Sequence, residues 1–399
     1  LPRMYRVRQQ FDETRLEDVA GTVRAELAKP EIRALVKPGM RIAVGVGSRG
    51  IQNFYTIVET TVNSLKELGA EPFIVSAMGS HGGGTEEGQR EVLAGYGITE
   101  ERLGVPVVTT VDTVYLGNCA NGRPVWFDRA AYEADLIVPI NRVKLHTDFV
   151  GPIQSGLCKM LVIGLGNHKG CSAVHEEAPE VFADAIEETA RLILQKAPVG
   201  FGIAILENAY DKTYDVEAVP AEHLVEREKE LVQIAKGNMP YIMLDEADVI
   251  ICGAIGKDIS GAGFDPNILG RSSVLKQFVL HIPRYQRLVL CDVTPASHGN
   301  GIGVGLFDVI TKKVAEQLDL ESMYANAIAC NCLGDASVPC TVDDEETAIR
   351  VALKCCRNID RDHPRIIRIQ NTLHLGEIEV SEALLDAVRA DSRMSLIEN

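Results

Sequence analysis

Short apolar runs alternate with segments of helical periodicity through the first half of the chain. The runs MRIAVGV (residues 40–46) and EPFIVSAM (71–78) flank VETTVNSLKELGA (58–70), where apolar residues recur at helical spacing up to Gly69. This order predicts a strand, a helix and a second, parallel strand. Because strands that alternate with helices form parallel sheets covered on both faces, we expect an α/β fold. The same reasoning predicts further strands at residues 105–110, 134–140 and 200–206, and a helix at 182–195.

A charged segment of helical periodicity, residues 220–240, separates this pattern from a second one like it. It ends in a cluster of Gly, Asn and Pro, which favours a turn. Beyond it, the pattern predicts strands at residues 287–293 and 365–370 and helices at 306–318 and 345–356. We therefore expect two α/β domains with mostly parallel sheets, namely residues 1–240 and 241–381, and a final segment, 382–399, that packs back on the first domain.

The balance of charge narrows the range of partners. The 399 residues include 40 basic and 56 acidic side chains, and the net charge of −16 disfavours nucleic acid or an anionic membrane as a partner. An anionic small substrate would then need a local cluster of basic side chains.

No apolar run reaches the roughly 18 residues of a membrane span, and the first residues lack the apolar core of a signal peptide, so we expect a cytoplasmic protein. The ten cysteines contain no CxxC pair and are expected to be reduced.

Glycine-rich and polar segments follow most of the predicted strands. Open α/β sheets bind ligands at the carboxyl ends of their strands, so these segments are the candidate site, which we expect in the cleft between the two domains. They are GSRGI (47–51), GSHGGG (79–84), NRVKLHTDFVGPIQSGLCKM (141–160), CGAIGKDISGAGFDPN (252–267) and TPASHGNGIGVG (294–305).

Histidines gather at this predicted edge. A single histidine in a loop is most often a turn or capping residue, but a group of them favours a chemical role. Five of the nine histidines lie in the glycine-rich loops: His81, His146, His168, His175 and His298.

Lys159 stands inside the apolar run GLCKMLVIGL (156–165). Burial of an unpaired ammonium group is so unfavourable that the group usually loses its proton or acquires a partner. Lys159 is therefore expected to be neutralised, paired or used covalently.

Common ligand-binding and hydrolase motifs are incomplete or missing. GLGNHKG (164–170) misses the dinucleotide-binding pattern by one residue, and the chain has neither a Walker loop nor a GxSxG elbow. A zinc hydrolase would be a further alternative, with His81, His146 and His175 as ligands, but these histidines do not show HxH or HExxH spacing. The main alternative to an enzyme is a nucleotide- or phosphate-binding α/β protein without metal chemistry.

The order and spacing of several residues resemble the nickel-pincer nucleotide-dependent lactate racemase superfamily. They are Arg49 after the first strand of the βαβ unit, His81 in GSH, His146 in KLH, Lys159 after a glycine-bearing run, and His175 sixteen residues further on. The resemblance covers most of the N-terminal domain. It implies an isomerase, a 2-hydroxyacid racemase or epimerase that transfers hydride reversibly between the substrate Cα and its cofactor.

The resemblance also implies the roles of four residues. Lys159 would hold the cofactor, pyridinium-3,5-bisthiocarboxylic acid mononucleotide, through a thioamide. Two sulfurs and a ring carbon of this nucleotide would bind nickel, and His175 would complete a square-planar centre. His81 and His146 would act as general acid and base on the substrate hydroxyl.

The loop after the first strand departs from the lactate-specific pattern. Where lactate-specific enzymes carry an acidic residue just before a threonine and an arginine, this chain has Val46 to Ser48. Ser48 and Arg49 are expected to bind the cofactor. The planar fork of Arg49 also fits a substrate carboxylate.

A second departure lies in the C-terminal domain. Lactate-specific members supply Tyr-Gln and a lysine to the substrate, whereas the matching place here is GAGFDPN (261–267). The expected substrate is therefore a 2-hydroxyacid other than lactate. Its carboxylate or hydroxyl is expected to contact Lys257, Asn267 or Arg271.

Overall fold

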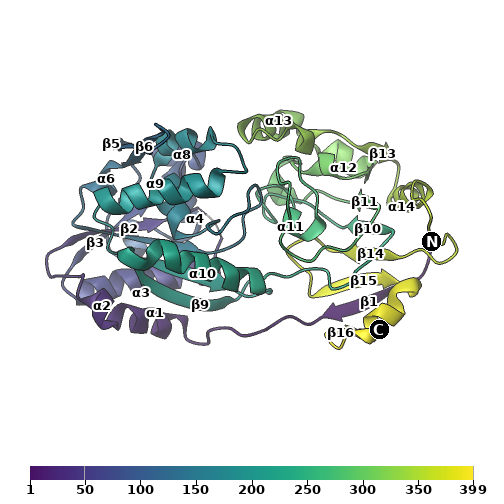
Figure 1. The fold of residues 1–399 in the computed structure, drawn as a ribbon, viewed down its shortest axis with the longest axis horizontal. Coiled ribbons are helices and arrows are strands. Elements are labelled where there is room, and N and C mark those ends of the chain that lie inside the picture. Colours follow the sequence, from purple (N-terminus) through teal and green to yellow (C-terminus); the bar gives the residue numbers. More distant parts are fainter. Residues whose placement is uncertain (49, 399) are drawn as a thin grey trace. The chain divides into compact units, whose positions relative to one another are not determined.

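The computed structural model describes residues 1–48 and 50–398. The chain forms two compact units: Glu13–Met239, here called the N-terminal unit, and Leu1–Asp12 together with Pro240–Asn399, here called the C-terminal unit. Figure 1 shows helices and strands in both. Each unit is α/β with a mostly parallel sheet, as predicted.

A six-stranded sheet forms the centre of the N-terminal unit. Its strand order is β4-β3-β2-β7-β8-β9, and all neighbours are parallel except β8 and β9. Every strand predicted from an apolar run in this unit is present. In sequence order, the six strands of the sheet are β2 (Arg41–Val46), β3 (Glu71–Ser76), β4 (Val107–Val108), β7 (Leu136–Arg142), β8 (Phe201–Glu207) and β9 (Thr213–Pro220).

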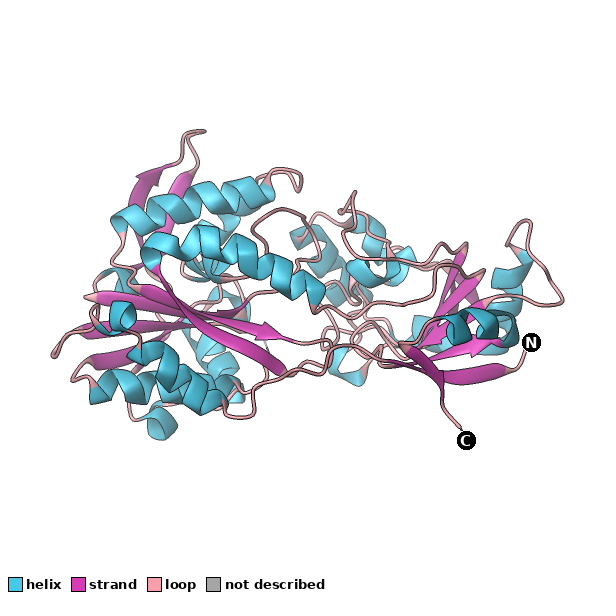
Figure 2. Cartoon of the chain, turned by 60° about the horizontal axis from the view of Figure 1, so that its bottom comes forward, coloured by secondary structure: helices cyan, strands magenta, loops and turns pink. Residues whose placement is uncertain are grey.

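Helices cover both faces of this sheet. Helices α1 (Val19–Ala28) and α3 (Phe54–Glu67) lie on one face, and α9 (Phe182–Lys196) and α10 (Leu224–Gly237) lie on the other (Figures 1 and 2). The remaining elements are α2 (Pro30–Arg33), η1 (Gly82–Gly84), α4 (Glu86–Gly95), α5 (Glu100–Leu103), β5 (Thr113–Asn118), β6 (Pro124–Asp128), α6 (Arg129–Tyr132), α7 (Leu157–Lys159), η2 (Met160–Gly164), α8 (Asn167–His175) and η3 (Ala221–His223).

An eight-stranded mixed sheet forms the centre of the C-terminal unit. The order is β13-β12-β11-β10-β14-β15-β1-β16; the first five strands are parallel and the last three pair antiparallel. In sequence order the strands are β1 (Met4–Gln9), β10 (Val249–Cys252), β11 (Arg287–Leu290), β12 (Val309–Thr311), β13 (Cys340–Val342), β14 (Ile366–Ile369), β15 (Glu377–Ser381) and β16 (Met394–Leu396).

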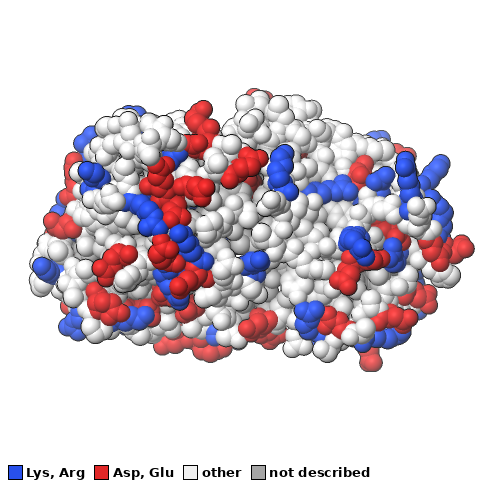
Figure 3. Space-filling model, in the orientation of Figure 1, with Lys and Arg blue, Asp and Glu red and all other residues white. Residues whose placement is uncertain are grey.

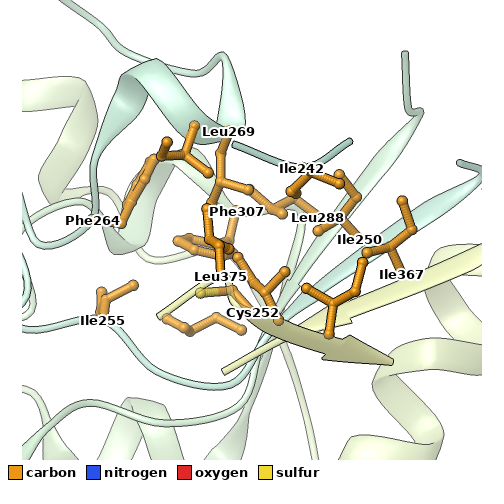
Figure 4. Packing of buried hydrophobic residues seen from close by; sticks show 14 of the residues in the cluster. Ile242, Ile250, Cys252, Ile255, Phe264, Leu269, Leu288, Phe307, Ile367 and Leu375 are labelled. Carbon is orange, nitrogen blue, oxygen red and sulfur yellow. The ribbon is translucent and has the colours of Figure 1, made fainter. Parts of the chain in front are cut away.

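The larger of two core clusters of this unit lies on one face of the sheet (Figure 4), and a smaller one, which includes Val249 and Ile251, lies on the other. Phe264 packs edge-on against Phe307 at a centroid distance of 5.4 Å, next to fully buried strand residues such as Ile250 and Leu288. The helical elements of the unit are α11 (Pro266–Leu269), η4 (Pro295–Ser297), η5 (Val304–Leu306), α12 (Lys312–Gln317), α13 (Leu320–Ala329), η6 (Leu333–Ala336), α14 (Glu345–Lys354), η7 (Glu382–Leu384) and α15 (Leu385–Ala390).

The structure differs from the sequence-based expectation in two places. The predicted helix at 306–318 is wrong: its first half contains strand β12, because Val309 and Ile310 are buried in the parallel sheet, and α12 begins only after Thr311 caps it. The ends of the chain also differ. The last segment belongs to the C-terminal unit, where its strand β16 pairs with β1, and Leu1–Asp12 is part of the same unit.

Charged side chains of both signs are interspersed on the face drawn in Figure 3. Some of them join α9 to α10: Arg191 pairs with Glu226, and Lys229 lies 2.9 Å from Glu187. In the part of the chain that the structure describes, no helix is long and apolar enough to cross a membrane. All ten cysteines are free thiols.

Candidate active site

Three loops with predicted site residues leave one edge of the N-terminal sheet. Strands β3, β2 and β7 are parallel neighbours, so their carboxyl ends lie side by side. Ser48 follows β2, His81 follows β3 and His146 follows β7. The topology therefore places these residues at the edge where α/β proteins bind ligands.

Ser48 and His81 are in direct contact. The Ser48 hydroxyl hydrogen-bonds to Nδ1 of His81, whose side chain is exposed. Buried Gln89 of α4 holds the backbone beneath His81, because its Nε2 donates to the carbonyl of Gly79 at 3.0 Å and to that of His81 at 3.4 Å. Tyr96 donates to the carbonyl of Ser48 at 3.0 Å. The imidazole is therefore presented to solvent from a fixed loop.

The glycines around His81 are required by backbone conformation. Gly79 and Gly82 have φ angles of 61° and 64°, in the left-handed region that favours glycine. A Cβ at Gly82 would lie 2.6 Å from the backbone nitrogen of Gln89, and one at Gly79 would lie 3.0 Å from the carbonyl oxygen of Ile163. The loop therefore lies tightly against α4 and η2.

Lys159 lies in an irregular helix beside this loop. Helix α7 continues into the π-helix η2, where the Leu165 amide bonds to the Met160 carbonyl at 2.8 Å. The carbonyl of Gly164, at the end of η2, accepts the amide of Gly79 at 3.0 Å. Short π-helical segments are frequent at functional sites. Here the segment connects the lysine-bearing turn to the loop of His81.

His146 contacts Lys159 directly. Its Nε2 lies 2.5 Å from Nζ of Lys159, and its Nδ1 accepts the backbone N–H of Asp148 at 3.0 Å. Because Nδ1 is an acceptor, the neutral ring carries its proton on Nε2, the atom that faces Lys159. The ring of Phe149 stacks on His146 at a centroid distance of 4.3 Å. The imidazole is therefore fixed in position, and it can accept a proton at Nε2 only when its own proton has moved to Nδ1, which requires the contact with the Asp148 N–H to open.

His175 is the last residue of α8. Its Nδ1 lies 2.7 Å from the carbonyl oxygen of Cys171, which can only accept, so Nδ1 carries the proton and the lone pair of the neutral ring is on Nε2. Phe182 contacts His175 edge-on at 5.1 Å and Phe149 at 4.8 Å. A continuous row of aromatic rings thus connects His175 with His146.

The thiol of Cys171 lies beside His175. Its Sγ is 3.5 Å from Nδ1 of His175 and 3.8 Å from the hydroxyl of Ser80. Burial raises the pKa of Cys171, but hydrogen bonds with His175 and Ser80 outweigh this effect, so the pKa lies below its usual value. The bond to Cys171 in turn raises the pKa of His175, against the effect of burial.

Two buried side chains that the sequence did not single out hold the start of α8. Asn167 has a left-handed φ of 50° and donates its Nδ2 to Asp128 at 2.8 Å. Asp128 also accepts the amide of Ala131 at 2.9 Å, and its burial raises the pKa of the carboxyl to about 6. These contacts orient the helix that ends in His175.

In the C-terminal unit, the predicted substrate residues differ in their surroundings. Nζ of Lys257 bonds to the carbonyl of Gly261 at 2.6 Å and to Oδ1 of Asn326 at 2.5 Å. Asn267 is buried and bonds to Asp265 at 3.1 Å.

Arg271 is held by an ion pair. It pairs with Asp308 at 2.7 Å and donates to the carbonyl of Leu306 at 2.8 Å. Its guanidinium also lies over the ring of Tyr285, 5.2 Å from the centroid. These contacts give Arg271 a structural role in the C-terminal unit. Arg49, the remaining predicted residue, lies outside the described residues.

The described residues contain no group of three or more His, Cys, Asp or Glu side chains that could hold a metal ion. His81, His146 and His175 therefore do not form the zinc site considered above. A metal with a single protein ligand needs no such group, so His175 alone remains the candidate ligand.

Comparison with known proteins supports the family resemblance. Residues 4–184 match the family model of the lactate racemase N-terminal domain. The fold is similar to that of the lactate racemase apoprotein from Thermoanaerobacterium thermosaccharolyticum, with a TM-score of 0.53 and 12% identity over 92% of this chain and 93% of that chain. A crystal structure of a protein from Thermotoga maritima is also similar, with a TM-score of 0.50 and 12% identity over 88% and 87% of the two chains. No curated protein matches the sequence at a significant level.

The fold is thus similar to that of a lactate racemase apoprotein. Within it, residues 4–184 match the lactate racemase N-terminal domain.

Proposed function

We propose that the protein is a nickel-dependent isomerase that racemises or epimerises a 2-hydroxyacid. The main observation behind this proposal is the contact between Lys159 and His146, 2.5 Å apart, beside the loop of His81. A lysine and two histidines on neighbouring loops combine an attachment point with two acid-base groups. The match to the lactate racemase N-terminal domain favours a racemase. His81, His146 and Lys159 also follow one another in the order found in that family.

The residues fit the cofactor that the family implies, a nickel-pincer nucleotide. Lys159 would hold it covalently, and His175 would bind nickel through Nε2. Metal-ligating histidines usually donate their other ring N–H to a carbonyl or carboxylate, and Nδ1 of His175 faces the Cys171 carbonyl in this way. When bound, such a group supplies a hydride acceptor and donor for the substrate Cα. Ser48 and Arg49 would contribute contacts to the nucleotide.

His81 and His146 would move the proton of the substrate hydroxyl. As the bond from Cα to hydrogen breaks, one imidazole takes the hydroxyl proton, which leaves a planar 2-oxoacid. When hydrogen returns to the opposite face of Cα, the other imidazole returns a proton to the oxygen. An imidazole suits both tasks because its usual pKa lies near neutral pH. Two bases are needed, because the two enantiomers present their hydroxyls on different sides.

A cationic side chain is needed for the substrate carboxylate. Arg271 is already paired with Asp308, and Asn267 is neutral and buried, so neither supplies this charge. We therefore propose the ammonium group of Lys257 for carboxylate binding. Substitution of Lys257 by methionine should raise KM for the hydroxyacid more than it lowers kcat.

The test is to produce the protein together with the enzymes that make the cofactor. Nickel content and intact mass are measured first, and a panel of single-enantiomer 2-hydroxyacids is then followed by chiral chromatography. We expect stoichiometric nickel, a nucleotide adduct and interconversion of one substrate class. A protein that binds a nucleotide or phosphate but takes up no nickel and isomerises nothing would contradict the proposal and favour the alternative, a binding protein.

A further inference from the structure

A buried glutamate from a distant helix holds the turn that carries Lys159. Glu228 lies on α10 and is fully buried. Its Oε2 accepts the backbone N–H of Cys158 at 2.8 Å, and its carboxylate also accepts the amide of Leu157. These are the first amides of α7, and the residue after them is Lys159. The carboxylate therefore occupies the N-terminal end of this short helix.

The backbone before the helix is shaped around this carboxylate. A Cβ on Gly156 would lie 2.6 Å from the carboxyl carbon of Glu228, so a larger residue cannot stand there without displacing the glutamate. On the opposite side, Nδ2 of Asn141, at the end of β7, donates to the Gly156 carbonyl at 2.8 Å. The turn is thus held between the central sheet and α10.

Helix α10 provides a rigid base for this contact. On its outer side, Glu226 pairs with Arg191 of α9, and Lys229 pairs with Glu187 at 2.9 Å. Glu228 points to the inner side of the same helical turn. The position of its carboxylate is therefore fixed by two helices of the scaffold.

If capping of helix α7 were the only role of Glu228, a glutamate would be an unfavourable residue at this position. A serine or threonine at the start of the helix could accept the same amides without a buried charge. Among the described residues, Oε1 of Glu228 has no hydrogen-bond partner, and burial raises the pKa of this carboxyl to about 7. The fold therefore retains a buried, incompletely hydrogen-bonded carboxyl group next to the lysine-bearing turn. Such groups concentrate at functional sites.

We propose that Glu228 is a positioning residue that fixes the backbone of Lys159 and thereby directs its amine toward His146. This inference rests on the proposed function, because it assigns Glu228 a purpose in cofactor attachment at Lys159. Glu228 itself does not touch the reacting atoms. Misplacement of a reacting group by about 1 Å can lower a rate by about 100-fold, so a loosened turn should strongly impair attachment.

The experiment compares three variants. Glu228→Leu removes both acceptor oxygens, and Glu228→Gln keeps the size and one acceptor. Thr61→Val is the matched control, because Thr61 is fully buried in α3 and loses one hydrogen bond to the Ile57 carbonyl. If Glu228→Leu does not fold, the comparison of Glu228→Gln with Thr61→Val decides the question.

Two measurements are made on each variant. The first is hydrogen exchange of the Leu157 and Cys158 amides in the protein without cofactor, relative to the slowest-exchanging amides. We expect it to rise at least about tenfold in Glu228→Leu, which removes the acceptor oxygens, and by a smaller factor in Glu228→Gln, which keeps one of them. The second is the fraction of Lys159 that carries the nucleotide after production with the cofactor-making enzymes. We expect it to fall about tenfold or more in Glu228→Leu and less in Glu228→Gln, and to stay unchanged in Thr61→Val.

The outcomes separate this inference from the proposed function. Unchanged exchange at Leu157 and Cys158, or an adduct yield equal to that of Thr61→Val, would overturn the role of Glu228. If the wild-type protein forms no adduct while the two amides respond as expected, the role of Glu228 in fixing the turn stands and the proposed function fails.

Discussion

The side-chain nitrogen of Lys159 lies 2.5 Å from Nε2 of His146, whose Nδ1 is occupied by the backbone N–H of Asp148. Two nitrogen atoms at this distance share one proton, so the amine and the imidazole are not both cations. Conversion of the amine to a thioamide would remove this contact and release Nε2 of His146 toward a substrate. In the proposed function, the same pair of atoms would connect cofactor attachment with acid-base chemistry.

Replacement of Lys159 by alanine should abolish the nucleotide adduct. The wild-type protein, produced with the cofactor-making enzymes, should show the extra mass by intact-mass spectrometry, and Lys159→Ala should not. Lys169→Ala is the control, because Lys169 lies ten residues further on and contacts the ring of Trp126, 4.8 Å from its centroid. An adduct that persists in Lys159→Ala would show that another residue holds the nucleotide.

His175→Ala should lose nickel while it keeps its fold. The substitution removes the only expected protein ligand at the exposed end of α8, so the melting temperature should change little, as for most surface substitutions. Nickel per chain, measured by elemental analysis after desalting, should fall about tenfold or more. His168→Ala, at an exposed position of the same helix, should retain it. Equal nickel content in both variants would contradict the assignment of His175.

His81→Ala and His146→Ala should each lower kcat in both directions by about 10² to 10⁴, because a complete cycle needs both imidazoles. KM should change less. In a single turnover, each loaded variant should still oxidise one enantiomer of the substrate, and the two variants should prefer opposite enantiomers. Stopped-flow absorbance with each enantiomer measures this preference. Equal impairment toward both enantiomers in each variant would argue against one base on each side.

Glu228→Gln should change the pH dependence of stability. Burial raises the pKa of Glu228 from 4.5 to about 7, so between these values the folded protein holds a proton that the unfolded chain releases. The stabilisation is therefore complete below pH 4.5 and is lost as the pH rises through 7. Relative to wild type, Glu228→Gln should be less destabilised at about pH 8 than at about pH 5, by about 2 to 3 kcal/mol.

Urea unfolding of both proteins at the two pH values measures this difference. Other groups titrate equally in both proteins, so their effects cancel in the comparison. A gap in the free energy of unfolding that is the same at both pH values would show that Glu228 is ionised in the folded protein throughout this range.

The apolar runs predicted the parallel strands of the N-terminal sheet and strands β11 and β14 of the C-terminal sheet, because these strands are buried on both faces and are continuous hydrophobic segments. The short parallel strands β12 and β13 and the antiparallel strands were missed. Strand β1 contains the alternation Arg6, Val7, Arg8, and its partner β15 lies at the far end of the sequence. Residues 306–318 were assigned to one helix because β12 is only three residues long and directly precedes α12.

Within the site, spacing was enough to single out His81, His146, Lys159 and His175. It could not find the residues that hold them, because these come from distant positions. Glu228 contacts a backbone amide 70 residues away, and Asp128 contacts Asn167 across 39 residues. Neither carboxylate belongs to a motif. In the sequence, a buried acidic residue of a charged helix cannot be distinguished from a solvent-exposed acidic residue. Only the structure shows which side of the helix faces the core.

The position of β1 between β15 and β16 in the C-terminal sheet has a consequence for synthesis on the ribosome. Arg6 of β1 and its ion-pair partner Glu377 of β15 are 371 residues apart, and β1 also pairs with β16. At roughly 5 to 20 residues per second, β1 leaves the ribosome roughly 20 to 75 seconds before its partner strands exist. During this interval the N-terminal unit can be completed, whereas β1 remains an unpaired strand attached to it. A chaperone that binds short extended segments would therefore find a target in β1, and deletion of β1 would leave β15 with an open edge prone to aggregation.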